Sequence, residues 1–345
     1  MKTLKEMMLP VPMDSGFKMD GYWVWCASVI KGEDSKYHMF ASRWEKTLPM
    51  HPGWLLKSEV VHAVSDNVLG PYRFSDVALP ERGPEFWDGC MTHNPHIKKV
   101  GDTYVLYYIG TTYPFTFTSE EITLSHPAVI SARAGKRVGV AYSKSVFGPW
   151  KRADRPLLDT RPCNGDSYLT SNPAPCLNEN GEVFMVYKGR KYIKSEQNPY
   201  LYSDMRLFTA KGRDAFSPLE RREDNIILQD AMGEIEDPFL WYDKGYHMIA
   251  KDMTGAVCGE KYAGIHAFSE NGTSWKIDGT PFYSRKIIFE DGKERIMGNM
   301  ERPFIFFEDG VPVCAFFAVS DNTDGTGILN CCETHNIAIP LKGGK

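Results

Sequence analysis

The 345-residue sequence contains no long hydrophobic run, and this absence limits where the protein can act. No apolar stretch approaches the roughly 20 residues that a membrane-spanning helix needs, so we expect no membrane partner. The first sixteen residues, MKTLKEMMLPVPMDSG, include basic residues but not the apolar segment of a signal peptide. We therefore expect a cytoplasmic location, or a periplasmic or secreted one if a leader has been removed.

The sequence also lacks blocks of like charge and closely spaced cysteine pairs. The formal net charge of -4 is spread along the chain, without the basic stripe or the aromatic motif of a nucleic-acid-binding domain, so nucleic acid is not an expected partner. The eight cysteines are scattered, and none forms the C-x-x-C pair of a zinc site. We expect free, buried thiols in a reducing compartment and no zinc.

Aromatic residues and turn formers, in contrast, are plentiful. Aromatic residues make up 13% of the chain, which also has 30 glycines and 22 prolines. This composition favours an all-β protein built from many short strands. No linker or low-complexity segment divides the chain, so we expect residues 1–345 to form a single domain.

One unit recurs five times along the chain. Each copy has polar residues, a short apolar strand, a turn and a second strand rich in Tyr, Phe and Val. Four copies carry a proline after the polar residues: THNPHIKKVGDTYVLYYIG (92–110), TSNPAPCLNENGEVFMVYKG (170–189), IEDPFLWYDKGYHMIAKD (235–252) and MERPFIFFEDGVPVCAFFA (300–318). A fifth copy, WCASVIKGEDSKYHMFASRW (25–44), lacks the proline.

A second element follows the first in several copies. An alternating segment runs into a Gly-Pro-aromatic turn at VVHAVSDNVLGPY (60–72) and at VGVAYSKSVFGPW (138–150), and GIHAFSENGTSW (264–275) is a related third copy. A unit of about seventy residues is longer than the roughly 40–50 residues of WD40 or kelch repeats. It suits a blade with long loops. The repeat therefore predicts a five-bladed β-propeller with four-stranded antiparallel blades around a central channel.

Polar residues open the first strand of each predicted blade, where they are expected to meet at one mouth of the channel. An Asn or Asp before proline favours extended backbone, which is a sufficient structural explanation for an asparagine alone. It does not explain several carboxylates beside an arginine, because buried carboxylates are usually paired or functional. The residues, in blade order, are Asp20, Trp23 and Trp25; Asp88, His93 and Asn94; Asp166, Ser171 and Asn172; Glu236 and Asp237; Glu301 and Arg302.

The E-D-P-F strand opening, the two N-P openings and the G-P-W hairpin resemble the five-bladed β-propeller glycoside hydrolases, such as families 43, 62, 32 and 117. The resemblance covers almost the whole chain. It implies that Glu236 is the general acid, that an aspartate of the first blade is the base or nucleophile, and that an aspartate of the second blade tunes the acid. The chain departs from this pattern, because WCASVI replaces the first-blade motif and Asn94 stands at the second-blade position.

The catalytic base therefore has three candidates: Asp20, Asp88 and Glu301. Glu236 is expected to stay protonated because of the neighbouring anion Asp237. Asp237 itself is expected to turn away from the channel and bond the backbone or Lys251, since successive strand residues face opposite sides. Arg302 is expected either to neutralise Glu301 or to bind a substrate oxygen.

Sugar-binding residues are expected around these carboxylates, while Trp241 is expected to pack between sheets. The segment 111–137 is a long insertion typical of a binding loop, a lid or a dimer contact. Its Arg133, Lys136 and Arg137 hint at an acidic or sulfated sugar, with a solvated charge run as the alternative. The expected sugar contacts are His93, Asn94, Trp87, Asp166, Asn172, Arg302, Trp25 and Lys251.

Our leading hypothesis is a hydrolase that releases a terminal sugar, with inversion at the anomeric carbon. The alternatives are a glycoside phosphorylase that holds phosphate with Arg302, His93 and Lys251, a non-catalytic glycan-binding propeller, and a scaffold for protein partners. A carbohydrate is the expected partner. No cofactor is expected, although the family resemblance allows a structural cation such as calcium in the channel.

Overall fold

The computed structural model describes residues 2–343 except 195–200, 223–225, 230, 232 and 324–326. Within these residues, four sheets have four antiparallel strands in chain order. They form blades I to IV: β1 (Tyr22–Lys31), β2 (Tyr37–Glu45), β3 (Glu59–Ser65) and β4 (Arg73–Leu79); β5 (Met91–Val100), β6 (Thr103–Thr111), β7 (Arg137–Ser143) and β8 (Lys151–Arg152); β9 (Leu169–Leu177), β10 (Val183–Arg190), β11 (Arg206–Gly212) and β12 (Ile226–Ile227); β13 (Ile235–Tyr242), β14 (Tyr246–Asp252), β15 (Gly264–Ser269) and β16 (Lys276–Ile277).

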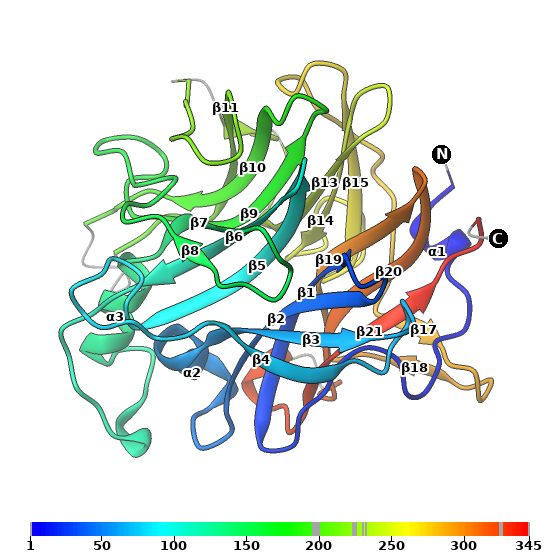
Figure 1. Ribbon diagram of the computed structural model, residues 1–345, viewed down its shortest axis with the longest axis horizontal. Coiled ribbons are helices and arrows are strands. Elements are labelled where there is room, and N and C mark those ends of the chain that lie inside the picture. The colour runs from blue at the N-terminus through cyan, green and yellow to red at the C-terminus, as the bar shows by residue number, and fades with distance from the viewer. Residues whose placement is uncertain are drawn as a thin grey trace.

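Blade V has three strands, and the start of the chain pairs with its outer strand. Its strands are β19 (Asn299–Glu308), β20 (Val311–Ser320) and β21 (Thr334–Pro340), and a hairpin of β17 (Lys286–Ile288) and β18 (Glu294–Ile296) precedes them. Phe17 and Asn336 exchange two backbone hydrogen bonds of 2.9 Å each. The two ends of the chain therefore meet, as Figure 1 shows, and close the five-bladed propeller that the repeat predicted.

The same irregularity interrupts the first strand of every blade. The ladder between the first and second strands shifts register in all five blades. Next to each shift stands one residue with a left-handed backbone: Cys26, Asn94, Asn172, Asp237 and Arg302, with φ of 57°, 54°, 50°, 57° and 55°. Such a bulge re-aims a side chain. Two successive residues of the strand can then face the channel, which strict alternation forbids.

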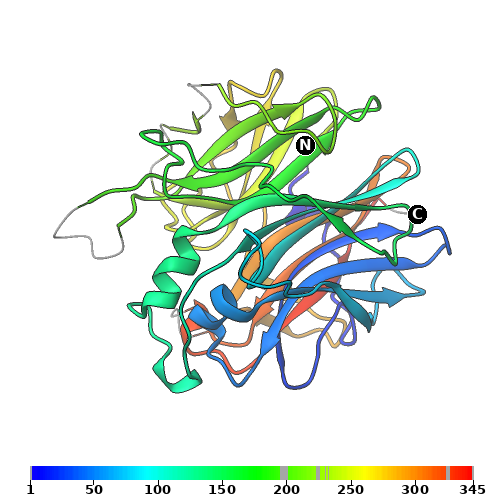
Figure 2. The same ribbon diagram turned by 60° about the vertical axis from the view of Figure 1, so that its left-hand side comes forward.

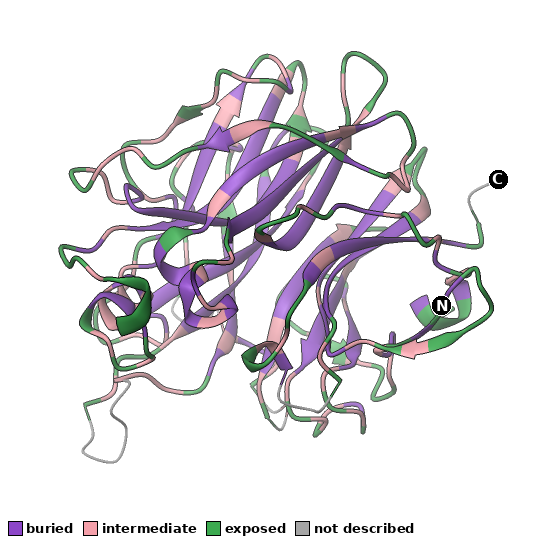
Figure 3. Ribbon diagram, turned by 90° about the horizontal axis from the view of Figure 1, so that it is seen from below, coloured by how far each residue is buried: buried purple, intermediate pink, exposed green. Residues whose placement is uncertain are grey.

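The apolar core lies between neighbouring blades, where the inner strands are buried almost throughout (Figure 3). Between blades II and III, for example, Val105 and Val140 pack with Met185 and Phe208. Full burial of such side chains contributes about 1.5–3 kcal/mol each. This packing holds the strand openings at fixed positions around the channel.

Helices are few and short, as expected, and two of them meet over one end of the propeller. They are α2 (Met50–Lys57) between β2 and β3, and α3 (Pro127–Ala134) between β6 and β7, which lie close together in Figures 1 and 2. Pro127 opens α3, and the His126 imidazole accepts a hydrogen bond from the Ala128 amide, so both favour a helix start here. The predicted insertion 111–137 thus folds partly into a helix. The remaining short helices are α1 (Leu4–Met7), η1 (Ser119–Glu121) and η2 (Gly327–Leu329).

No helix within the described part of the chain is long and apolar enough to span a membrane.

Candidate active site

The five bulged residues meet in the channel and form a ring of hydrogen bonds. The Cys26 thiol donates to Asn94 Oδ1 at 3.0 Å, and Asn94 Nδ2 donates to Asn172 Oδ1 at 2.9 Å. Asn172 Nδ2 donates to Asp237 Oδ1 at 2.6 Å, and Arg302 Nη1 donates to the same oxygen at 2.9 Å. Arg302 also interacts with the Cys26 thiol. Each blade contributes one member, so the ring fixes the blades relative to one another.

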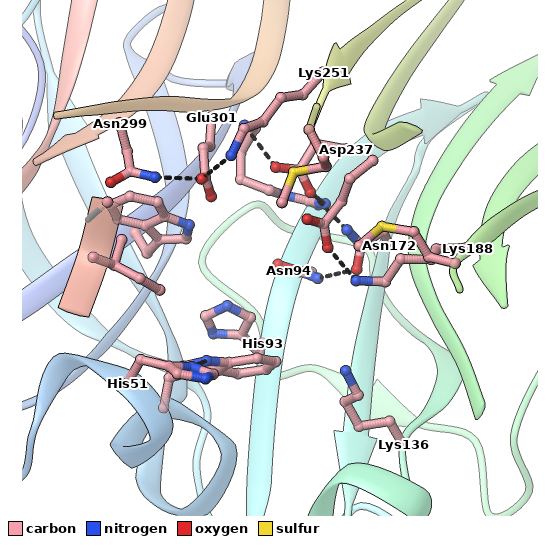
Figure 4. Close-up of a pocket in the computed structure, with 18 of the residues that line it drawn as sticks. His51, His93, Asn94, Lys136, Asn172, Lys188, Asp237, Lys251, Asn299 and Glu301 are labelled. Atoms are coloured by element: carbon pink, nitrogen blue, oxygen red, sulfur yellow. Dashed lines mark hydrogen bonds and ion pairs between the residues drawn. The ribbon is translucent and has the colours of Figure 1, made fainter. Parts of the chain in front are cut away.

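A pocket of about 290 Å³ lies against this ring (Figure 4). Its lining includes four ring members, and also Trp25, His93, Glu236 and Glu301, each of which directly precedes a ring residue. Because the bulge lets both residues of each pair face inward, the same local geometry builds the ring and the pocket wall.

Two part-buried glutamates face this pocket, and each pairs with a lysine of the preceding blade. Lys188 of β10 forms an ion pair with Glu236 of β13. Lys251 of β14 forms an ion pair with Glu301 of β19, at Oε1. Asn299 Nδ2 donates to the same Glu301 oxygen at 2.6 Å. Both donors to Glu301 therefore use one oxygen.

The surroundings shift the pKa values of the two glutamates in opposite directions. Burial alone would raise the pKa of Glu236, but the cations Lys188 and Lys251 outweigh it and lower this pKa to about 2. For Glu301, burial is the largest influence, and the anions Asp237 and Glu236 add to it, so its pKa is raised despite Lys251. Glu236 is thus the group that stays ionised, and Glu301 the group that retains a proton more readily.

An aromatic and imidazole wall forms another side of the pocket. Trp54 of α2 stacks on His93 with ring centroids 4.6 Å apart, and its Nε1 donates to His51 Nδ1 at 2.9 Å. His93 Nδ1 lies 2.7 Å from the Ser58 hydroxyl. Burial lowers the pKa of His93 well below its ordinary value and that of His51 to about 3. Both imidazoles are therefore neutral, and His51, whose Nδ1 accepts, carries its proton on Nε2.

The solved structures that resemble this chain share its fold over nearly the whole length. A family 117 glycoside hydrolase from the marine bacterium Zobellia galactanivorans matches with a TM-score of 0.65 at 14% identity, covering 97% of this chain and 88% of that one. A thermostable family-43 glycoside hydrolase matches with a TM-score of 0.62 at 14% identity, covering 98% and 96%. An endo-arabinase from Bacteroides thetaiotaomicron matches with a TM-score of 0.57 at 11% identity, covering 97% and 98%.

The fold is that of the five-bladed β-propeller glycoside hydrolases. The resemblance seen in the sequence is therefore confirmed at the level of fold. No protein-family model and no curated protein sequence matches the chain.

In this propeller most of the predicted site residues do come together. The described pocket lining contains Glu236 and Glu301 among the predicted catalytic residues, and Trp25, His93, Asn94, Asn172, Lys251 and Arg302 among the predicted sugar contacts.

Asp20, Asp88, Asp166 and Trp87 are not part of that lining. Asp20 lies exposed on the surface, in the turn before β1. Trp87 instead packs on Tyr108, with ring centroids 5.8 Å apart, and its Nε1 donates to the Ala153 carbonyl. The expectation that these residues reach the pocket is corrected accordingly.

Asp88 and Asp166 are fully buried, but in the packing of blades II and III. Asp88 accepts from Arg82 at 2.7 Å and from the Tyr108 hydroxyl at 2.6 Å, with Arg152 at 3.5 Å. Asp166 has an equivalent set, with Arg161 at 3.0 Å, Tyr187 at 2.8 Å and Arg221 at 3.1 Å. Each carboxylate is neutralised by two arginines, so we assign it a structural role within its blade.

Three expectations about neighbouring charges are also corrected. Asp237 does not turn away from the channel, because the bulge carries it into the ring, where it bonds Asn172 and Arg302 rather than Lys251. Arg302 consequently neutralises Asp237 and not Glu301. With Lys188 beside it, Glu236 is not held protonated by Asp237. Trp241 stacks on His247 outside the pocket, which agrees with the expected packing role.

Lys188, His51 and Trp54 are site residues that the sequence did not single out. The internal repeat held a signal for Lys188, because VYKG of β10 aligns with IAKD of β14 and places Lys188 on the position of Lys251. No comparable signal marks His51 and Trp54, because α2 lies in the segment between β2 and β3, outside the strand-turn-strand unit that repeats.

The ring does not fit the structural calcium ion that the family resemblance allowed. Calcium takes six to eight oxygen ligands, mostly from carboxylates and carbonyls. The ring offers one carboxylate, Asp237, and Arg302 already neutralises it. No cluster of three His, Cys, Asp or Glu side chains that could hold a metal occurs among the described residues.

Proposed function

We propose that the protein is a glycoside hydrolase whose catalytic carboxyl pair is Glu236 and Glu301. The observation that supports this assignment is the opposite environment of two part-buried carboxyl groups on adjoining blades of one pocket. Glycoside hydrolysis requires one protonated and one ionised carboxyl group beside the scissile bond. Pairs of titratable groups whose pKa values are pushed apart meet this requirement.

Glu301 acts as the general acid in this proposal. Lys251 and Asn299 both donate to Oε1 of Glu301. The proton of the neutral carboxyl group therefore sits on Oε2, from which it passes to the oxygen of the leaving sugar as the glycosidic bond breaks.

Glu236 is the ionised partner. Lys188 keeps it deprotonated at neutral pH, so it accepts the proton of the attacking water, with inversion at the anomeric carbon as the predicted outcome. Lys188 also compensates the charge of Glu236 in this buried site, which makes ionisation possible there.

The pocket favours a single terminal sugar residue as its occupant. Its volume of about 290 Å³ is at the lower end for small-molecule sites. Trp54 offers an aromatic face, and Asn94 and Asn172 offer amide groups at the ring. A small pocket of this kind suits release of one sugar from the end of a glycan.

A phosphorylase is the second candidate, because Arg133, Lys136 and Arg190 add three cationic side chains to the same pocket. Phosphate would then replace water as the attacking group, and the proton would still come from Glu301. Dependence of turnover on phosphate separates the two activities.

The test is a panel of aryl glycosides and oligosaccharides, assayed with and without phosphate, with the anomer of the first product read by proton NMR. The variants are Glu236→Gln and Glu301→Gln, with Glu308→Gln as the matched control. Glu308 lies on the same strand β19 but forms an exposed pair with Lys31 outside the pocket. Activity that the two pocket variants abolish and the control retains supports the proposal. Full activity in either pocket variant overturns it.

A further inference from the structure

The charges in the pocket lining do not balance. Three carboxylates line it, and each has one cationic partner there: Lys188 for Glu236, Lys251 for Glu301 and Arg302 for Asp237. Three more cationic residues, Arg133, Lys136 and Arg190, belong to the same lining. The pocket therefore has an excess of positive charge beyond its carboxylates.

Among the described residues, only one of these three additional cations forms an ion pair with a carboxylate. Arg190 Nη2 lies 3.4 Å from Glu234 Oε1, and its Nη1 donates to the Ser203 carbonyl at 2.6 Å. Arg133 contacts the Tyr202 ring, with 5.6 Å from its guanidinium carbon to the centroid, and forms no ion pair with a described residue. Arg133 and Lys136 thus have no ion-pair partner among the described residues.

Lys136 is the more unusual of the two, because its residue is only 3% exposed. Its amine lies 5.0 Å from the centroid of the Trp54 ring and has no hydrogen bond or ion pair with a described residue. In Figure 4 it extends toward the pocket below Lys188, away from Glu301 and Asn299. Burial and the neighbouring cations Lys188 and Arg133 lower the pKa of Lys136 well below its ordinary value.

A buried lysine among other cations is costly unless a counter-ion accompanies it. The Nε2–H of His51 provides a neutral donor in the same pocket, since Trp54 occupies its Nδ1. Two cations without an ion-pair partner among the described residues and one neutral donor form a site for a compact, negatively charged group with several acceptor oxygens.

We propose that Lys136, Arg133 and His51 bind an oxyanion inside the pocket. The oxyanion is either the carboxylate or sulfate group of an acidic sugar, or free phosphate. The binding site itself stands on its geometry, whereas the role of the oxyanion in turnover rests on the proposed glycosidase function.

The two sources of the oxyanion predict different reactions. With an acidic sugar, water attacks the anomeric carbon, Glu236 takes the proton of water, and Glu301 protonates the leaving oxygen. With phosphate, a phosphate oxygen forms the new bond to the anomeric carbon while the glycosidic bond breaks. Glu301 then gives its proton to the leaving oxygen and recovers one from the sugar phosphate.

Binding is tested by isothermal titration of the full chain with inorganic phosphate, sulfate and glucuronate, with glucose as the neutral probe. The variants are Lys136→Met and Arg133→Gln, and Lys151→Met is the control because Lys151 is exposed on β8 of the same blade. We expect at least one oxyanion to bind the wild type, and each pocket variant to weaken it at least tenfold. The control should bind as the wild type does.

Equal binding by wild type and both pocket variants identifies an adventitious ion only and overturns the inference, as does the absence of binding by all three oxyanions. Lys136→Met should fold, because it removes a charge that has no ion pair with a described residue, and the half-exposed Arg133 gives a second variant if it does not.

Turnover then distinguishes the sources. Stimulation by phosphate, lost in Lys136→Met, assigns phosphate. Preference for a glucuronide or a sulfated glycoside over the neutral glycoside, lost in the same variant, assigns an acidic sugar. If no glycoside is turned over but oxyanion binding depends on Lys136, the proposed function fails and this inference stands. If a neutral glycoside is turned over and Lys136→Met changes neither binding nor kcat/KM, the inference fails and the proposed function stands.

Discussion

Blades II and III bury carboxylates in a different way from blades IV and V. Asp88 and Asp166 have no exposed surface, and each is held by two arginines and a tyrosine hydroxyl. Glu236 and Glu301 retain 17% and 13% side-chain exposure, and each has a single lysine as its ion-pair partner. Burial and proximity to an arginine or lysine are therefore shared by both regions. What separates them is access to a cavity and the number of cations that neutralise each carboxylate.

This difference shows how one repeat can provide carboxylates that stabilise the fold and carboxylates that are available for catalysis. A carboxylate that two arginines saturate has no oxygen left for a substrate, and its removal should damage the fold. A carboxylate with one partner and an open side can exchange a proton. The predictions that follow test this distinction, from the largest expected effect to the smallest.

Removing the pocket carboxylates should have the largest effect, a loss of catalytic rate. We expect Glu236→Gln to lower kcat by about 10³-fold or more on every substrate. Glu301→Gln should lower kcat by a similar factor on a glycoside with a poor leaving group, such as an unactivated alcohol. On a dinitrophenyl glycoside the loss of kcat should be less than about tenfold, since that leaving group needs no proton. Initial rates on a matched pair of glycosides check this. Equal sensitivity of both variants to the leaving group would contradict the roles assigned to Glu236 and Glu301.

Removing a carboxylate from blades II or III should affect stability instead. Asp88→Asn and Asp166→Asn each remove a fully buried carboxylate that pairs with two part-buried arginines, and breaking a buried pair costs about 3–5 kcal/mol. Urea unfolding followed by tryptophan fluorescence measures the loss. If these variants unfold like the wild type but lose activity per folded molecule, the structural role assigned to Asp88 and Asp166 is wrong.

Changing the lysine of a pocket pair should move the pH profile. Glu236 has an ordinary pKa of 4.5 and a folded-state pKa of about 2, so it remains ionised, and its pair stabilises the fold, at any pH above 4.5. That stability is lost as pH falls from 4.5 toward 2. Lys188→Met removes the nearest cation, so the acid limb of kcat/KM should move up by about one pH unit or more. An unshifted limb would argue against Glu236 as the ionised catalytic group.

A surface pair on the same strand should show the smallest effect. Glu308 and Lys31 are 44% and 48% exposed at the side chain, and exposed pairs contribute about 0–1 kcal/mol. Glu308→Gln should therefore change neither kcat nor the unfolding midpoint by a measurable amount. A large effect of Glu308→Gln on either quantity would mean that removing any negative charge from β19 lowers activity. The rate loss in Glu301→Gln could then not be assigned to the pocket.

Much of the architecture follows from the sequence because the strands and turns depend on patterns of a few neighbouring residues. The five copies of the strand-turn-strand unit predict β1–β2, β5–β6, β9–β10, β13–β14 and β19–β20 within a few residues of their observed bounds. The residue before each repeated proline, and Cys26 in the copy without proline, also occupies the same bulge in every blade. Local pattern and tertiary role coincide at these positions.

The candidate site was predictable only in part, for reasons visible in single residues. Glu236 and Glu301 could be named because they open strands at repeat positions. Asp88 stands close to such a position but meets Arg82 and Arg152, and nothing local predicts that pairing. Lys136 lies in an insertion that resembles a solvated charge run in sequence, and only the packing of α3 against α2 buries it.

The sequence alone determined the number of blades, the place where each blade begins and the chemical types gathered near the channel, since strand alternation and turn residues act over a few positions. The tertiary structure decided which carboxylates face the pocket, which lysine meets which glutamate, and hence the direction of each pKa shift. These properties depend on distances across blades, and a charge responds to its neighbours in space wherever they lie along the chain.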